Sequence, residues 1–446
     1  MKLKIFIITF FFLSCISTNA ENKIDFVEYN LDNGLHVILS PNNTTPIVAI
    51  TVTYHVGSKN EKPDRTGFAH FFEHLMFEGS EYIKRGQYDQ YVQNAGGYDN
   101  ASTSFDKTIY YEVLPSNQAA LGLWLESERM LHLKIDSAGV ETQRAVVKEE
   151  RKQRLDNQPY GTILEETFSH AYKVSPYRWT PIGSVQYIDK ATLQEFREFY
   201  KTFYVPNNAV LSIAGDFKIP EMKELVNKYF EGIPKGTKEI YRPDIVEPKQ
   251  TKENIDTVYD NIQLPAVIKA FHIPAEGTKD YYAIEMLTTL LSEGQSSRLY
   301  KQLVDNEQKA LYVGSYVFSL ENPGLFLVYA IANMNVKAND LDSAIDAEIT
   351  KVKDKLIDER EFEKLRNQTE DDFVNSKKTD RGVALALADY YLFYDGNTDL
   401  INTELERYLS VTRDDIKRVA DEYLTKKNET LLYYLPKSVQ MSKEEK

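Results

Sequence analysis

Apolar and polar residues alternate where each half of the chain begins, and apolar residues at helical spacing follow. In the first half, the runs FVEYNLDNGLHVILS and PIVAITVTYHVGS alternate, are rich in β-branched residues and are separated by the turn-rich PNNTT. Such runs are typical of strands. From Phe68 to Met76 the apolar residues recur at helical spacing, which indicates a helix that begins after Gly67. The pattern predicts a strand pair followed by a helix.

The first half continues as a mixture of helices and strands. In chain order we expect a helix in QYDQYVQNAGG, a strand in ASTSFDKTIYYEVL, helices in LGLWLESERMLHL and VETQRAVVKEERKQRL, and a strand in VLSIAGDF. Residues 235–254 are rich in Pro, Lys and Glu and poor in apolar residues, which predicts a linker. We therefore assign an N-terminal domain to residues 21–234.

The second half, residues 255–446, repeats this order. We expect a strand in NIQLPAVIKAFHI, helices in YYAIEMLTTLL and SSRLYKQL, strands in LYVGSYVF and GLFLVYAIA, and helices from Asp340 onward. A strand-rich start followed by helices in both halves predicts an α+β fold built from two duplicated units.

The first twenty residues have the layout of a secretory signal peptide. Lys2 and Lys4 precede an apolar run that ends in small residues at Ala20, and the run is too short to span a bilayer comfortably. We expect cleavage after Ala20 and export to the periplasm, with a lipid anchor at Cys15 as the minor alternative. Cys15 is the only cysteine, so a mature chain has no disulfide, and we expect no transmembrane segment in it.

Composition and charge exclude one class of partner. The 446 residues are 42% hydrophobic and 27% charged, as in an ordinary soluble globular protein, and the formal net charge is -14. Binding to phosphate backbones needs clustered Lys and Arg, and the sequence has no such block. We therefore expect no nucleic-acid partner.

The predicted helix after Gly67 carries an unusual group of polar residues. Within the motif HFFEH, His70 and His74 are four residues apart and Glu73 lies between them. Positions i and i+4 share a face of a helix, so both imidazoles can converge on one ion. A catalytic zinc site also needs a third protein ligand and a base, and Glu73 is placed to be that base.

A plainer interpretation is a hydrogen-bonded pair of core histidines with Glu73 as an exposed charge. Three polar groups interrupt a phenylalanine-rich face here, however, and burying them without a metal or partners would cost several kcal/mol. The third ligand then decides between the two interpretations. In VVKEE, Glu150 lies on the inward stripe with Val146 and Val147, whereas Glu149 is rotated toward a solvated edge. We therefore favour Glu150.

Several motifs together resemble the pitrilysin or insulinase family of zinc endopeptidases, also called M16 or inverzincins. HFFEH is followed in order by NAST at residues 100–103, VVKEE at residues 146–150 and PYG at residues 159–161. The resemblance covers the whole mature chain. It implies two homologous α/β-sandwich halves of the LuxS/MPP-like metallohydrolase fold, which form half of a clamshell dimer. It also implies one Zn²⁺ per chain, held by His70, His74 and Glu150, with Glu73 as the general base.

The resemblance also implies where a peptide substrate binds. In the family a peptide adds as a strand to an exposed sheet edge near the metal, and the matching residues here are Asn100, Ala101 and Ser102. Backbone pairing of this kind gives affinity with little sequence preference. A turn leading into a core strand is the other interpretation of NAST.

Two departures from the family pattern concern charges near the reaction centre. Gln143 stands where many members have a further glutamate. Active chains of the family that work alone or as homodimers usually supply an Arg and a Tyr from the second half. Here Tyr312 matches the tyrosine, but Val304 or Asp305 occupies the arginine position. Arg298 lies about two turns earlier and is as well explained as a structural residue. We therefore expect a heterodimer with a zinc-less homologue that supplies Arg and Tyr.

The sequence thus predicts a zinc metalloendopeptidase that degrades peptides or unfolded segments, as the catalytic subunit of a heterodimer. The alternative is a non-catalytic peptide-binding or assembly subunit of the same fold, and the intact set of His70, Glu73, His74 and Glu150 argues against it. An unrelated binding protein with a structural metal would need a closed site of four ligands, whereas three are evident.

Overall fold

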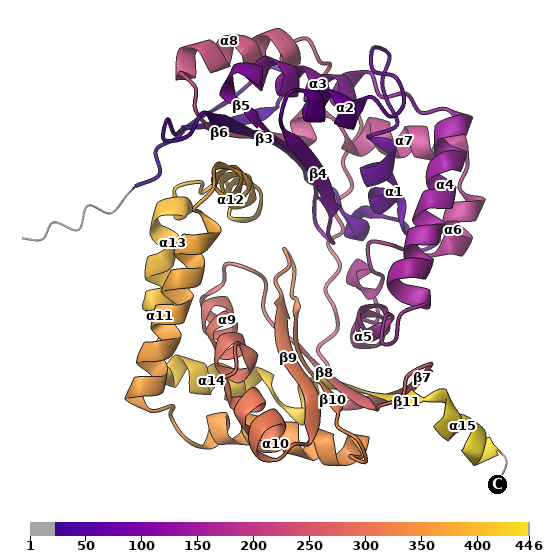
Figure 1. The fold of residues 1–446 in the computed structure, drawn as a ribbon, viewed down its shortest axis with the longest axis vertical. Coiled ribbons are helices and arrows are strands. Elements are labelled where there is room, and N and C mark those ends of the chain that lie inside the picture. The colour runs from indigo at the N-terminus through magenta and orange to yellow at the C-terminus, as the bar shows by residue number, and fades with distance from the viewer. Residues whose placement is uncertain (1–22, 445–446) are drawn as a thin grey trace, which may run out of the picture.

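A computed structural model describes residues 23–444, so the predicted signal peptide at residues 1–20 and Cys15 lie outside the described residues. Two lobes face each other across a central opening (Figure 1). Each lobe is a twisted sheet with helices on its faces, so the chain has the two α/β halves that the sequence predicted. No helix among the described residues is long and apolar enough to cross a bilayer.

The first lobe holds a six-stranded sheet in the order β1-β2-β6-β3-β5-β4. The strands β2 and β6 are parallel, and the other neighbours are antiparallel. The strands are β1 (Val27–Asn30), β2 (His36–Pro41), β3 (Ile47–Tyr54), β4 (Tyr98–Thr103), β5 (Thr108–Pro115) and β6 (Ala209–Gly215). The strand β4 forms one edge of this sheet.

The second sheet repeats the topology of the first. Its order is β7-β11-β8-β10-β9, with β7 and β11 parallel and the other neighbours antiparallel. Its strands are β7 (Asn254–Asp260), β8 (Ala266–His272), β9 (Ala310–Phe318), β10 (Leu325–Ala332) and β11 (Glu429–Pro436). The five strands from β2 to β4 in the first sheet and the five from β7 to β9 in the second follow the same pattern, one parallel pair and then antiparallel neighbours. The edge strand β9 is therefore the counterpart of the edge strand β4.

Several strand predictions need correction. FVEYNLDNGLHVILS forms two strands, β1 and β2, because a turn at Asp32–Asn33 interrupts the run. ASTSFDKTIYYEVL likewise forms the hairpin β4–β5. The predicted pair β2 and β3 are not neighbours, since β6 lies between them. The strands β7 and β11 were missed; they pair with each other across almost the whole second half, and β11 also pairs with β8.

Helices surround both sheets. The first lobe contains α1 (Phe68–Leu75), α2 (Tyr88–Asn94), α3 (Ala119–Leu131), α4 (Ser137–Arg151), α5 (Ile163–Ala171), α6 (Val185–Lys190), α7 (Leu193–Phe203) and α8 (Ile219–Phe230). The second contains α9 (Lys279–Ser292), α10 (Ala338–Asp354), α11 (Glu359–Ser376), α12 (Asp380–Phe393), α13 (Leu400–Leu409), α14 (Arg413–Tyr423) and α15 (Lys437–Glu444). No helix or strand forms between α8 and β7.

The halves exchange helices. The helix α12, from the second half, packs its buried residues Val383, Ala384 and Leu387 against β2 and β6 of the first sheet. In return α5, from the first half, packs on β8 and β11 of the second sheet, with Phe168 in a shared core. Figure 1 shows α12 directly below the first sheet and α5 beside the second. Each half therefore completes the other's core.

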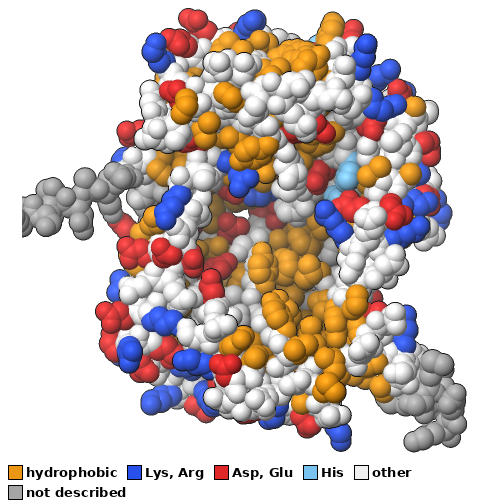
Figure 2. All heavy atoms as spheres, in the orientation of Figure 1, with side chains coloured by type: hydrophobic (Ala, Val, Ile, Leu, Met, Phe, Trp, Pro, Cys, Tyr) orange, Lys and Arg blue, Asp and Glu red, His pale blue; other side chains and the backbone are white. Residues whose placement is uncertain are grey.

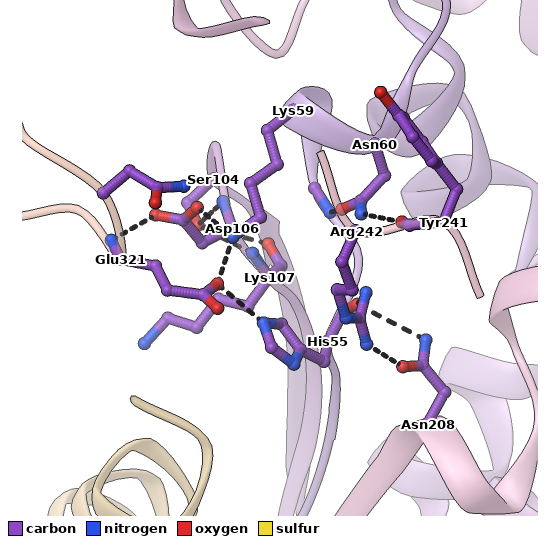
Figure 3. Close-up of polar contacts among 12 residues, drawn as sticks. His55, Lys59, Asn60, Ser104, Asp106, Lys107, Asn208, Tyr241, Arg242 and Glu321 are labelled. Carbon is purple, nitrogen blue, oxygen red and sulfur yellow. Dashed lines mark hydrogen bonds and ion pairs between the residues drawn. The ribbon is translucent and has the colours of Figure 1, made fainter. Parts of the chain in front are cut away.

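A polar network joins the two halves where they meet (Figure 3). Lys59 of the first half is buried and pairs with Asp106, at 2.7 Å, and with Glu321 of the second half. His55 Nε2 lies 2.7 Å from the same Glu321 carboxylate. Arg242, in the segment between the halves, donates to the His55 carbonyl at 2.6 Å. These contacts hold the halves in one arrangement beside the cleft described next.

Candidate metal centre

The helix α1 is fixed at its first turn by a carboxylate. Gly67 precedes it with φ of 95°, a left-handed conformation that glycine adopts without strain. The Glu61 oxygens accept hydrogen bonds from the backbone N–H groups of Gly67, at 2.9 Å, and Ala69, at 2.8 Å. Those donors would otherwise lack partners. Burial raises the pKa of Glu61 to about 8, so its hydrogen bonds, and not a full negative charge, hold the helix end. Glu61 thus sets where α1 begins.

Aromatic packing sets which way α1 faces. Phe68 and Phe71 stack on Phe196 of α7, with ring centroids 4.7 and 4.5 Å apart. Phe72 stacks on Phe199 of the same helix at 5.4 Å. Burying this face against α7 turns the other face, with its two histidines, toward α4.

The third predicted ligand comes from α4, which packs against α1. Oε2 of Glu150 lies 3.5 Å from Nε2 of His70 and 3.1 Å from Nε2 of His74. One ligand atom from each of the three residues lies within 4.8 Å of the others. Glu149 is on the exposed side of α4, as its position on the helix predicted.

The donor set fits a divalent cation. Burial, together with the neighbouring His74, lowers the pKa of His70 to about 4, so its imidazole is neutral and can donate a lone pair. The imidazole of His74 lowers the pKa of Glu150, which favours the carboxylate. Oε2 of Glu150 is buried, and no hydrogen-bond donor among the described residues is aligned with it. A metal ion between the three side chains would satisfy that oxygen.

Glu73 lies on the same helix face and lines the same cleft as the three ligands. Burial raises the pKa of Glu73, and the nearby Thr103 hydroxyl on β4 partly offsets this effect. A carboxyl with a raised pKa is a better proton acceptor than an exposed one. Glu73 is therefore suited to accept a proton beside the metal ligands.

The cleft measures about 600 Å³ and runs along the edge strand β4. Asn100, Ala101 and Ser102, the predicted substrate-binding residues, line it. Their strand pairs only with β5, so its other edge offers backbone groups to an incoming strand. NAST therefore belongs to an edge strand, not to a turn.

Two residues of this region were missed by the sequence interpretation. Arg154 lines the cleft, and its Nη1 donates to Oε1 of Glu150 at 2.8 Å, which leaves Oε2 facing the histidines. Its position four residues after Glu150 was the available signal. Glu61 lies six residues before Gly67, and only the fold reveals that it caps α1.

The residues predicted from the second half lie elsewhere. Tyr312 is on β9, is 52% exposed and packs beside Tyr329, outside the metal cleft. Arg298 forms an ion pair with Glu361 of α11, which gives it a structural role. Val304 and Asp305, at the arginine position of the resemblance, belong to a π-helical segment, Tyr300–Asn306. Within the described residues, the cleft's lining contains no arginine or tyrosine from the second half.

The chain is similar to known peptidases over both halves. Residues 36–179 match the family described as "Insulinase (Peptidase family M16)", and residues 190–369 match "Peptidase M16 inactive domain". "Zinc protease PqqE" of Helicobacter pylori is 36% identical over 91% of this chain and 92% of that protein. A protein of Arabidopsis thaliana named "Probable mitochondrial-processing peptidase subunit beta, mitochondrial" is 24% identical over 89% of this chain and 76% of its own length. The crystal structure of a protease from Helicobacter pylori matches with a TM-score of 0.89 and 34% identity, over 93% of this chain and 100% of that one.

Proposed function

Because the chain belongs to the M16 (insulinase) family of peptidases, we propose that it is a zinc metalloendopeptidase that cleaves peptides or unfolded segments. The observation that carries this proposal is the meeting of His70, His74 and Glu150 in one cleft with Glu73, beside the open edge of β4. A non-catalytic peptide-binding subunit would use the open edge, but it would need no base beside the metal ligands.

His70, His74 and Glu150 would hold the zinc ion. When bound, zinc lowers the pKa of a water molecule toward neutrality and polarises a carbonyl group. Glu73 takes a proton from the attacking water and later gives it to the leaving amine. The edge of β4 holds the peptide backbone in extended form, so the scissile bond lies beside Glu73.

A partner chain completes the site. Tyr312 lies outside the metal cleft and Arg298 is tied to Glu361, so this chain does not supply its own carbonyl-polarising groups. The proposed arrangement is a clamshell heterodimer with a zinc-less M16 homologue that supplies Arg and Tyr. The signal-peptide pattern at residues 1–20 supports the periplasm as its location.

The test is hydrolysis of a quenched fluorescent peptide library by the zinc-loaded mature chain, alone and mixed with a two-half homologue encoded beside it. Cleavage that appears only in the mixture, and is lost with Glu73→Gln, is the expected result. Equal cleavage by the chain alone would refute the proposal that a partner chain completes the site. Zinc binding without cleavage in either sample would refute the peptidase and favour a non-catalytic binding subunit.

A further inference from the structure

A second large cavity lies in the second half of the chain, lined partly by residues of the segment 190–369 that matches "Peptidase M16 inactive domain" and mostly by residues after it. It also measures about 600 Å³ and is enclosed by α9, α11, α12 and α13. In Figure 2 acidic side chains border the opening between the two halves. The reaction at His70 and His74 uses none of this cavity's residues.

The cavity is strongly acidic. Six carboxyl groups line it, against one lysine, Lys377. They are Glu276, Glu285, Glu293, Asp372, Asp389 and Glu404. Lys107 pairs with Asp389 from outside. Subtracting both lysines from the six carboxyls leaves four acidic groups in excess.

Hydroxyl groups, not cations, hold the inner carboxyls in place. Tyr394 donates to Glu276 at 2.9 Å, and Ser319 donates to Glu285 at 2.9 Å. Glu404 accepts a hydrogen bond from the Tyr390 hydroxyl, and its Oε1 lies 3.3 Å from the Tyr394 hydroxyl oxygen. Within the described part of the chain, these three carboxyls form no ion pair. The donors orient the carboxyls and leave their charge uncompensated.

Aromatic rings form the other walls, and they already attract an ammonium group. Tyr281, Phe373, Tyr390, Tyr394 and Tyr408 line the cavity. Nζ of Lys377 lies 3.1 Å from the centroid of the Phe373 ring and 5.6 Å from that of Tyr390. Aromatic faces bind alkylammonium and guanidinium groups in this way. The chain's own lysine thus lies against these rings, where burial lowers its pKa to about 8 and the negative charge of Glu404 partly offsets that effect.

The arrangement favours an organic cation over a metal ion. Among the described residues, three ligand atoms within 4.8 Å of one another occur at His70, His74 and Glu150 and at Asp342, Asp346 and Glu429, and not in this cavity. Acids spaced around a large volume suit an extended ligand. The acids at Asp342, Asp346 and Glu429 in turn surround the buried ammonium of Lys269.

A third pocket adjoins both the acidic cavity and the metal cleft. This pocket, of about 420 Å³, lies between the two and shares Thr103, Leu164 and Thr180 with the cleft. The same pocket shares Glu276 with the acidic cavity. A peptide held on β4 would reach the acidic cavity by way of this pocket, past Glu276.

We propose that this cavity binds an ammonium or guanidinium group on an aliphatic stem, either a basic side chain of a peptide held in the metal cleft or a free diamine. The peptide source rests on the proposed function, whereas the cation site does not. The site would make the second half a contributor to substrate selection.

The first experiment measures binding of agmatine by calorimetry to the mature chain carrying Glu73→Gln, without zinc or cleavage. Saturable binding at one site is expected. Glu285→Gln and Glu404→Gln should each weaken it roughly tenfold, the value of one charge-assisted hydrogen bond. Glu406→Gln removes the same charge from the exposed side of α13 and should change nothing. No saturable binding, or equal weakening by Glu406→Gln, would overturn the proposal.

A second variant separates loss of a site from loss of folding. Lys377→Met removes the resident ammonium and should strengthen agmatine binding severalfold, which a misfolded chain cannot do. Unchanged or weaker agmatine binding would contradict a cation site lined by these aromatic rings. Burial raises the pKa of Glu276 and of Glu285 to about 7. Because a cation favours ionised carboxylates, agmatine affinity should also rise between about pH 6 and 8.

The charged groups that face Glu276 and Glu285 are the other acids of the cavity, with Lys377 from the end of α11 and Lys107 from the β4–β5 hairpin. Burial also lowers the pKa of Lys377 to about 8, so this lysine begins to lose its charge at the upper end of that pH range, which favours agmatine in the same direction.

The final arm identifies the source of the cation. Two peptides that differ only in arginine against citrulline, its neutral isostere, are bound to the Glu73→Gln chain with and without agmatine. Tighter binding of the arginine peptide, displaced by agmatine, assigns the site to the substrate. Equal binding of both peptides, with agmatine still bound, assigns it to a free cation. Failure of cleavage alone would refute the peptidase and leave the cation site standing.

Discussion

The contact between the two halves at Glu321 makes a quantitative prediction. Glu321 belongs to the second half, and its carboxylate meets His55 and Lys59 of the first (Figure 3). Glu321→Gln keeps the size of the side chain and removes its charge. Lys59, whose side chain is only 3% exposed, then retains Asp106 as its remaining anion.

The magnitude follows from the pKa of Glu321. Burial raises this pKa, but His55 and Lys59 outweigh burial and bring it from 4.5 to about 2. A shift of roughly 2.5 units corresponds to about 3.4 kcal/mol at 1.36 kcal/mol per unit. The side chain is 31% exposed, so solvent screening reduces the expected value to about 2 kcal/mol.

The sign of the pH dependence is fixed by the direction of the shift. A carboxyl with a depressed folded-state pKa stabilises the fold above its unfolded pKa, and the stabilisation is lost as the pH falls from 4.5 toward 2. Urea unfolding at pH 7 should therefore show Glu321→Gln less stable by about 2 kcal/mol, and near pH 2.5 the difference should largely vanish. A difference that is the same at both pH values would refute the reasoning.

Three further changes test other parts of the structure. Lys269→Met removes a fully buried ammonium from its three carboxylates and should lower the free energy of unfolding by about 3–5 kcal/mol, measured in urea; a loss below about 1 kcal/mol would contradict the buried network. Glu61→Gln weakens the cap of α1 and should lower the free energy of unfolding by about 1–2 kcal/mol. It should also weaken zinc binding, measured by chelator competition, and unchanged zinc affinity would show that the cap does not position the ligands. His74→Ala should weaken zinc affinity by more than about a hundredfold in the same competition, and wild-type affinity would exclude His74 as a ligand.

The candidate site was largely predictable because its signals are local. The spacing of His70 and His74 places both on one face of α1, and Glu150, three residues after the buried Val147, faces them while Glu149 is exposed. The predicted inward stripe was wrong at Val146, which is 42% exposed. The burial of Phe68 and Phe71 follows from the same periodicity, whereas their partner on α7 is known only from the fold. Periodicity within one helix is set by backbone geometry and needs no knowledge of the rest of the fold.

The parts that sequence reasoning missed depend on distant partners. The strands β7 and β11 pair across nearly the whole second half, and the exchange of α5 and α12 between the sheets has no local signature. The hairpin β4–β5 was read as one strand because its turn, at Ser104 to Lys107, lacks glycine and proline. The acidic cavity gathers residues from four helices, so only the folded chain brings them together.

The most direct test of the central claim compares the wild-type chain with Glu73→Gln at equal zinc content, each mixed with the partner homologue. Zinc is measured by elemental analysis, and cleavage is followed with one quenched peptide. The account predicts one zinc per chain in both samples, with cleavage in the wild type and none above background in the variant. Equal cleavage by both chains, or no zinc in the wild type, would contradict a metallopeptidase site at His70, His74 and Glu150.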